Sequence, residues 1–287
     1  MNKDKFTEIS KMVPSTMLNP DAPLFKVLRD NPPKWWSMLI EDPEIYIEVR
    51  KGNIIHIYYY GARIAEIDYK TGLFTANCHY KYISGNTHTK DGYGSCIHLL
   101  EKNLNQLKKN ASAFYVKDTE EEDTSEKRIQ GRLRIDNDHR YIDTEFAHAY
   151  CKADDNDLIR FDLVAVDNNE LKIEELKRVG DSRLRTSDMI SNPPEVLNQM
   201  TRYSNFMSVN KDELCTYYQT LLKIKADLGL PMPIGYDMRK PLVLDPTPIL
   251  LIKNLYRYSK MSKKRYERIR DIRKTLDHNN IKYYFLP

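Results

Sequence analysis

Apolar residues alternate with polar ones through most of the stretch from Glu44 to Tyr82. Short runs rich in Ile, Val and Tyr are separated there by turn signals at residues 51–53, at Gly61 and at residues 70–72. A repeat of two places successive side chains on opposite faces of a strand. These runs therefore predict an antiparallel β-meander.

One helix is expected after the meander, because leucines recur at helical spacing between Ser95 and Lys109. The meander and this helix predict a first domain over residues 35–116. The preceding segment, residues 1–34, contains five prolines, which act as breakers and predict an irregular structure. Residues 117–125 are rich in Asp and Glu and predict a solvated acidic linker.

The second half of the chain predicts a different order of elements. A β-hairpin is expected from Leu158 to Lys177, where two apolar-rich runs flank a reversal at residues 167–170. The other expected elements are helices over Glu126–Arg134, from Asn192, over Lys211–Leu228 and over Lys263–Leu276, and strands over Arg140–Cys151, Pro248–Leu255 and Ile281–Leu286. Together they predict a second domain over residues 126–287, and a chain of α/β type that is α+β overall.

Three ionisable residues stand inside the apolar strands of this hairpin. Asp162 lies in the middle of the first strand. Glu175 and Lys177 lie two residues apart in the second strand, and they share a face because side chains alternate along a strand. Charged groups in apolar surroundings are costly unless they are paired or bound to a metal. The hairpin is therefore the candidate functional stretch.

Composition places the chain among soluble globular proteins, with 41% apolar and 30% charged residues in a length of 287. That length suits two domains of ordinary size. No window approaches the ~18 apolar residues of a membrane span, and the charged start Met1–Phe6 leads into no apolar signal segment. The four cysteines are widely spread, which fits a reducing interior. We expect a cytoplasmic protein that does not enter a membrane.

The order of these residues resembles the PD-(D/E)xK superfamily, the restriction-endonuclease-like nucleases. Phe161-Asp162 is followed by Glu175-Leu176-Lys177 on the next strand, and then by a helix with the sequence Gln-Met-Thr-Arg-Tyr over residues 199–203. The resemblance covers about Glu126 to Pro287 and is greatest to DNA-repair and defence nucleases. Phe161 replaces the proline that names the motif. The resemblance implies a mixed sheet flanked by helices.

A metal-dependent nuclease that hydrolyses phosphodiester bonds, in DNA more than in RNA, is the activity that the resemblance implies. Asp162 and Glu175 would be the carboxylate ligands of Mg²⁺, or of Mn²⁺, and the Leu176 carbonyl would be a further ligand. Lys177 would hold or activate the attacking water and stabilise developing charge.

Several side chains near the motif are candidates for supporting roles. Gln199 and Tyr203 lie four residues apart on one helical face, so both can point at the site as positioning residues. Glu145 in the preceding strand is a candidate for a third carboxylate ligand, although a register slip of one residue would turn it away. Glu126 is the alternative on a helix.

Other interpretations of the same residues stay open. Asp162 and Lys177 could form a cross-strand ion pair. The chain could be a binding protein that keeps a nuclease-like fold without cleaving nucleic acid, or an RNA-processing nuclease. The first domain could serve a homodimer or a partner protein. The 20 tyrosines are typical of strands, and aromatic rings can also stack on bases.

Positive charge is concentrated near the C-terminus. Between Leu251 and Lys274 ten Lys or Arg residues face only two acids, an excess of eight in a chain whose net charge is +4. Apolar residues supply a buried face for the helix in this segment, which leaves the basic residues outward. Such a surface is typical of either a solvated helix or a phosphate-binding face. Lys263, Lys264 and Arg268 are the candidate nucleic-acid contacts.

Overall fold

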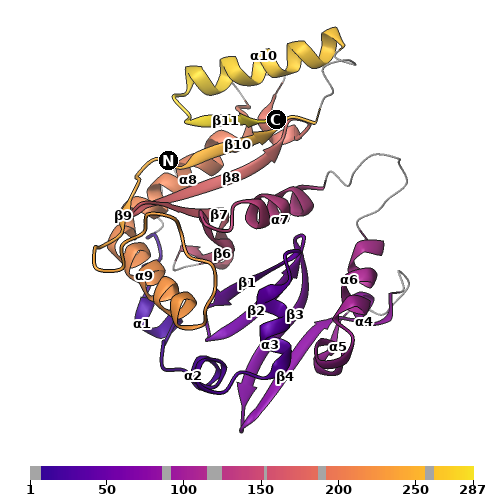
Figure 1. Cartoon of the computed structure of the whole chain (residues 1–287). Coiled ribbons are helices and arrows are strands. Elements are labelled where there is room, and N and C mark those ends of the chain that lie inside the picture. The colour runs from indigo at the N-terminus through magenta and orange to yellow at the C-terminus, as the bar shows by residue number, and fades with distance from the viewer. Residues whose placement is uncertain (1–7, 86–91, 115–124, 152–153, 187–191, 256–261) are drawn as a thin grey trace.

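Two β-sheets and the helices around them form an α+β fold in the computed structural model of the chain (Figure 1). The structure describes residues 8–85, 92–114, 125–151, 154–186, 192–255 and 262–287. Nearly all of the acidic linker predicted over residues 117–125 lies outside the described residues. The α+β fold class expected from the sequence is confirmed.

The first sheet is the predicted antiparallel meander, with strands paired in chain order. It contains β1 (Ile45–Arg50), β2 (Ile54–Tyr59), β3 (Ala62–Lys70), β4 (Leu73–His79) and β5 (Tyr93–Ser95). The single helix expected after it is two helices, α5 (Ile97–Lys102) and α6 (Leu104–Ala113), beside a short α4 (Tyr80–Ser84). Asn103 separates α5 from α6, because its backbone is not helical and its side chain accepts from the Gln106 amide at the start of α6.

The N-terminal segment, predicted to be irregular, contains helices between its irregular stretches. It contains α1 (Pro14–Met17) and α2 (Pro23–Asp30), and α3 (Lys34–Glu41) begins at its end. Pro14 and Pro23 stand at the first position of their helices, where the missing N–H is no loss. Leu24, Phe25 and Leu28 of α2 are buried in the core. The prolines therefore start these helices instead of breaking them.

The second sheet is mixed, with the strand order β11-β10-β8-β7-β6. Its elements are α7 (Glu126–Asp136), β6 (Tyr141–Cys151), β7 (Asp154–Asp167), β8 (Glu170–Arg178), the 3₁₀ turn η1 (Ser182–Leu184), α8 (Glu195–Val209), α9 (Lys211–Asp227), β9 (Val243–Leu244), β10 (Ile249–Lys253), α10 (Lys263–His278) and β11 (Tyr283–Leu286). Strands β6, β7 and β8 are antiparallel, whereas β10 runs parallel to both β8 and β11. The hairpin predicted from Leu158 to Lys177 is the β7–β8 pair.

Helices cover both faces of the mixed sheet (Figure 1). On one face α8 and α10 pack against β10, where Met200 and Ile272 meet Leu250 in one apolar cluster. On the other face α7 contributes Ile129 to a cluster that includes Leu163 of β7. In the described part of the chain, no helix combines the length and the apolar character needed to cross a membrane.

Helix α7 also packs directly on the first sheet, at the turn between β2 and β3. A Cβ atom added to Gly131 of α7 would lie 2.3 Å from the backbone of Gly61, and one added to Gly61 would lie 2.1 Å from the Lys127 carbonyl. Gly61 also has a φ of +86°, which side chains disfavour. The two glycines therefore allow the helix and the turn to meet backbone to backbone.

Buried charges join the two sheets behind this contact. Glu48 of β1 accepts from Arg134 of α7 at 2.9 Å and from Lys225 of α9 at 3.1 Å, and all three side chains are buried. Beside them Arg50 of β1 donates to Asp143 of β6. One large apolar cluster contains residues of both sheets. The first sheet and the mixed sheet thus share a core across the predicted domain boundary.

The buried ammonium of Lys225 predicts a pH dependence of stability. Burial lowers the pKa of Lys225 to about 8. Burial opposes ionisation of Glu48 as well, but Lys225 and Arg134 hold the pKa of Glu48 below its usual value. Lys225 therefore loses its proton near pH 8 in the folded state, and near pH ~10.4 when unfolded. Between these values the unfolded state binds more protons, so the free energy of unfolding rises with pH by up to about 1.4 kcal/mol per unit.

Chemical denaturation of wild type and of Lys225→Met, from pH 7 to pH 10, measures this contribution. The free energy of unfolding of wild type relative to the variant should be constant below about pH 8 and rise above it. Lys223→Met is the control, because Lys223 is exposed two residues earlier in the same helix. A wild-type curve that runs parallel to the Lys225→Met curve throughout would contradict the prediction.

Candidate active site

Strands β7 and β8 separate at the acidic residue that the sequence singled out. Their ladder runs from Asp167 paired with Glu170 to Leu163 paired with Glu174, and there it ends. Strand β8 continues beside β10 as far as Arg178. Asp162 stands at this fork, with its side-chain Oδ2 accepting from the Leu176 amide at 2.9 Å. The side chain thus takes the place of a backbone acceptor where the two strands part.

Glu175 and Lys177 occupy the continuing strand beyond the fork. Their side chains are 2% and 1% exposed. The Lys177 ammonium donates to Oε1 of Glu175 and, at 3.2 Å, to the Leu176 carbonyl. Lys177 is thus paired with Glu175 instead of the Asp162 partner expected from the cross-strand alternative.

Helix α8 brings the predicted Gln199 and Tyr203 to the same carboxylate. Gln199 Nε2 donates to Oε1 of Glu175 at 2.7 Å, and the Tyr203 hydroxyl lies 2.5 Å from Oε2. The hydroxyl also contacts the backbone carbonyl of Arg160, so it has two acceptors for one proton. Both oxygens of Glu175 are held by side chains, and its orientation is fixed.

Electrostatics at the fork disfavour ionised Asp162. Burial raises the pKa of Asp162 well above its usual value, and the Glu175 carboxylate raises it further. Lys177 and the Leu176 amide act in the opposite direction without balancing these effects. Burial and Glu175 likewise raise the pKa of Tyr203, so its hydroxyl stays protonated. Lys177 alone therefore does not compensate both carboxylates, and a bound cation would favour the ionised form of Asp162.

Helix α7 supplies two side chains to the site from the opposite face of the sheet. Gln130 Nε2 donates to the Asp162 carbonyl at 2.5 Å. Glu126, one turn earlier, is close enough to Glu175 and Lys177 to interact electrostatically with both, and burial raises its pKa. The sequence had named Glu126 only as the alternative acid and had not named Gln130. Their spacing of four residues was a signal that both face one direction.

Arg183 of η1 closes the edge of the site and was not predicted. Its guanidinium lies 2.7 Å from Asp181 and 3.7 Å from Glu126. The hydrogen bond from Arg183 to Asp181 is the main cause that raises the pKa of Arg183, and the negative charges of Asp181 and Glu175 raise it further. The arginine adds a permanent positive charge next to the carboxylates.

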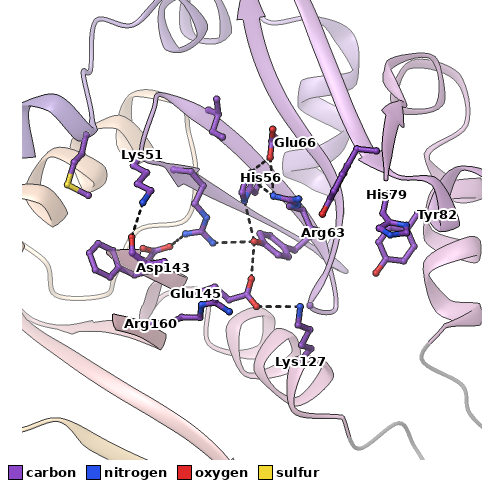
Figure 2. A pocket seen from close by; sticks show the side chains of 18 of the residues that line it. Lys51, His56, Arg63, Glu66, His79, Tyr82, Lys127, Asp143, Glu145 and Arg160 are labelled. Atoms are coloured by element: carbon purple, nitrogen blue, oxygen red, sulfur yellow. Dashed lines mark hydrogen bonds and ion pairs between the residues drawn. The ribbon is translucent and has the colours of Figure 1, made fainter. Parts of the chain in front are cut away.

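Glu145 does not join this site. It has a φ of +53°, which turns its side chain out of the strand's regular alternation. Its carboxylate lies 3.4 Å from the Tyr58 hydroxyl and 3.8 Å from the Lys127 ammonium. Figure 2 shows these side chains at a cavity between the two sheets, lined among others by Arg50, His56, Arg63, Lys127, Glu145 and Arg160 and named here the intersheet cavity. The structure thus corrects the expectation of a third carboxylate from β6.

Glu174 points away from the site, as alternation along β8 requires. Its carboxylate accepts from the Tyr141 hydroxyl at 2.8 Å and from Arg140 at 2.5 Å. The two neighbouring glutamates of β8 thus serve different faces of the sheet, and only Glu175 belongs with Asp162.

The donor set fits a magnesium ion that keeps several of its waters. Among the described residues, no group of three or more His, Cys, Asp or Glu side chains is arranged to hold a metal ion by itself. Mg²⁺, however, commonly takes only one or two carboxylates, with waters and substrate phosphate completing its shell. Asp162, Glu175 and the Leu176 carbonyl offer oxygen donors of this kind.

The basic helix α10 lies at the end of β8 that follows Lys177. Arg268 donates to the carbonyls of Gly180 at 2.7 Å and Asp181 at 3.3 Å, so this predicted nucleic-acid contact anchors the helix to the protein. Lys263 and Lys264 are exposed at the helix start. Two of the ten basic residues counted in the sequence, Arg257 and Lys260, lie outside the described residues.

Comparison with known proteins adds no relative. No family model matches the chain, and neither curated proteins nor solved structures gave a match.

Tyr203→Phe tests the hydrogen bonds that hold Glu175. The substitution leaves buried acceptors on Glu175 and Arg160 without their donor, which costs about 1–3 kcal/mol of folding stability. Tyr217→Phe is the matched control, since Tyr217 is equally buried and its hydroxyl makes no hydrogen bond to a described residue. Denaturant titration of both variants should show a loss for Tyr203→Phe that clearly exceeds the loss for Tyr217→Phe; equal losses would argue against this role.

Proposed function

We propose that the chain is a metal-dependent nuclease that hydrolyses phosphodiester bonds in DNA. The proposal rests on one observation: Asp162, Glu175 and Lys177 meet where β7 and β8 part, with both oxygens of Glu175 held by Gln199 and Tyr203. The resemblance of these residues to the PD-(D/E)xK nucleases gives the same activity. The alternative of an Asp162–Lys177 ion pair lacks support, because Lys177 is paired with Glu175.

Asp162, Glu175 and the Leu176 carbonyl are the groups that would hold Mg²⁺ or Mn²⁺. When bound, the metal ion supplies an activated water and neutralises charge on the phosphate. The raised pKa of Asp162 supports this role, because a carboxylate that is costly to ionise alone becomes favourable beside a divalent cation. The ionised Asp162 carboxylate is thus unfavourable without a metal ion, and the oxygen donors around it suit one.

Lys177 contributes the positive charge nearest to the carboxylates. Its ammonium can hold the attacking water and stabilise the negative charge that develops on the phosphate oxygens. Burial favours both effects, since an electrostatic interaction is stronger where water is excluded. Gln199 and Tyr203 act as positioning residues, because they touch Glu175 and keep its oxygens in place.

DNA as substrate is supported by the position of α10. Arg268 ties the helix to Gly180 and Asp181, three and four residues after Lys177. Lys263 and Lys264 are exposed one turn away on the same helix. A phosphate backbone that enters the site from this side would meet these two lysines first.

Asp162→Asn separates the metal site from a purely structural carboxylate. Ionised Asp162 costs stability at neutral pH because burial and Glu175 raise its folded pKa, so the isosteric amide should increase the melting temperature in EDTA. Mg²⁺ should raise the melting temperature of wild type and not of the variant. Cleavage of labelled DNA should be lost in Asp162→Asn and in Glu175→Gln.

Lys177→Met should reduce cleavage by roughly 10²–10⁴-fold while Mg²⁺ still stabilises the protein. Glu170→Gln, an exposed position at the start of the same strand, is the control and should remain active. Duplex and single-stranded DNA and RNA are compared in one assay. A wild-type protein that cleaves none of them and gains no stability from Mg²⁺ or Mn²⁺ would refute the proposal, and cleavage of RNA alone would reassign the substrate.

Lys263 and Lys264 predict the salt dependence of DNA binding. Replacing both by Gln removes two phosphate contacts, which should lower the slope of log affinity against log salt by about 1.8 on duplex DNA. Lys109→Gln is the control, because Lys109 is exposed on α6, away from α10 (Figure 1). Fluorescence anisotropy at several salt concentrations measures the slope. An unchanged slope in the double variant would show that α10 is only a solvated surface.

A further inference from the structure

The intersheet cavity has the size and lining of a binding site. Its volume is about 660 Å³, within the range of about 300–1,000 Å³ that is usual for ligand sites. Figure 2 shows side chains from the first sheet, from α7 and from the mixed sheet around it. Both halves of the protein therefore contribute to one cavity.

Positive charge dominates the lining. Six Lys or Arg side chains face three Asp or Glu side chains, an excess of three positive charges with the histidines taken as neutral. The acids have partners of their own: Asp143 accepts from Arg50 and Glu66 accepts from Arg63, and Glu145 faces Lys127. Three cations, Lys51, Lys81 and Arg160, remain outside these pairs. Lys81 lies over the rings of Tyr82 and Phe114, which leaves Lys51 and Arg160 for an anion. Lys51 donates to the Ala147 carbonyl at 3.2 Å, and no described carboxylate lies within ion-pair distance of Lys51 or Arg160. The cavity is thus suited to an anion.

The rim also presents an aromatic ring. Tyr93 is 56% exposed, and the Arg63 guanidinium lies 5.2 Å from its ring centroid. Burial, together with Arg50 and Arg63, lowers the pKa of His56 to about 2, so His56 offers hydrogen bonds and no charge. Cations beside an exposed tyrosine are the combination that binds single-stranded nucleic acid, through phosphates and base stacking.

Arg160 connects this cavity to the candidate active site. Its side chain also lines a smaller cavity of about 170 Å³ whose lining includes Gln199 and Tyr203, the two residues that hold Glu175. Along β7, Arg160 precedes Asp162 by two residues, about 7 Å of extended strand. An anion held by Arg160 would therefore lie next to a phosphate at Asp162.

We propose that the intersheet cavity binds one or two nucleotides of a single strand whose neighbouring phosphate lies at Asp162 and Glu175. This inference rests on the proposed nuclease function and adds the form of its substrate. Duplex DNA does not fit between the sheets in a cavity of this volume, whereas an unpaired strand does. The substrate class is accordingly DNA with a single-stranded segment, such as an overhang, a flap or a free single strand.

The test compares binding and cleavage of a fluorescent single-stranded oligonucleotide, a blunt duplex and a duplex with a single-stranded tail. Binding is measured in EDTA and cleavage in Mg²⁺. The variants are Arg160→Gln, Lys51→Gln and Tyr93→Ala. The controls are Lys223→Gln on α9 and Tyr284→Ala on β11. Tyr284 is 53% exposed, and it alternates along the strand with Tyr283 and Phe285, which pack on the cluster under α10. Melting temperatures verify that all variants fold.

Each cavity variant should weaken binding of the single strand and of the tailed duplex by roughly tenfold, the effect of losing one stacking or phosphate contact. Binding of the blunt duplex and the control variants should be unchanged. Tyr93→Phe should bind normally, since stacking needs only the ring. If the wild type cleaves and the cavity variants bind and cleave the single strand as well as the wild type, the inference is overturned and the nuclease function stands.

Loss of binding in the cavity variants of a protein that does not cleave would support the cavity site and refute the nuclease function. The last part of the test is competition by a deoxynucleoside monophosphate. Saturation with it should displace the single-stranded oligonucleotide. A monophosphate that binds and leaves oligonucleotide binding intact would identify a separate small-ligand site and overturn the inference.

Discussion

The buried cluster of Glu48, Arg134 and Lys225 is the interaction on which the rest of the structure depends. Removing three ions from water is costly, and each becomes more costly if a partner is lost. The partners come from β1, α7 and α9, so the cluster exists only when both sheets are in place. Together with the backbone contact of Gly61 and Gly131, it sets the position of α7 to a precision that apolar packing alone does not give.

Helix α7 transmits that position to the candidate active site. Arg134 at its C-terminal end is held by the ion cluster, while Gln130 and Glu126, one and two turns earlier, reach the Asp162 carbonyl and the surroundings of Lys177. Asp162 itself is costly to ionise in this place. Helix α7, which is anchored at the ion cluster, thus holds in place a carboxylate that destabilises the fold. Functional groups that cost stability and are supported from elsewhere are common in active sites.

The sequence was sufficient to predict the parts that follow from local periodicity. Alternation along the hairpin identified Asp162, Glu175 and Lys177, and it placed Glu174 on the opposite face from Glu175. The four-residue spacing on α8 added Gln199 and Tyr203. Glu145 could not be predicted correctly, because its positive φ is a local choice of backbone that no repeat encodes. Arg183, and the anchoring of Arg268 to Gly180, could not be predicted for another reason: the partners lie in segments that only the tertiary fold brings near.

The same arrangement implies that the first sheet belongs to one folded unit with the candidate active site and is not an appended module. Without it, Arg134 and Lys225 would lose Glu48, and Asp143 would lose Arg50. Removing one partner of a buried ion pair is strongly destabilising. The apolar core is also continuous across both sheets. Helix α7, which carries residues of both the intersheet cavity and the Asp162 site, would lose the surface that orients it. A change that loosens the contact between the sheets should therefore displace α7, and with it the surroundings of Asp162, while the strand pairing of the mixed sheet is kept.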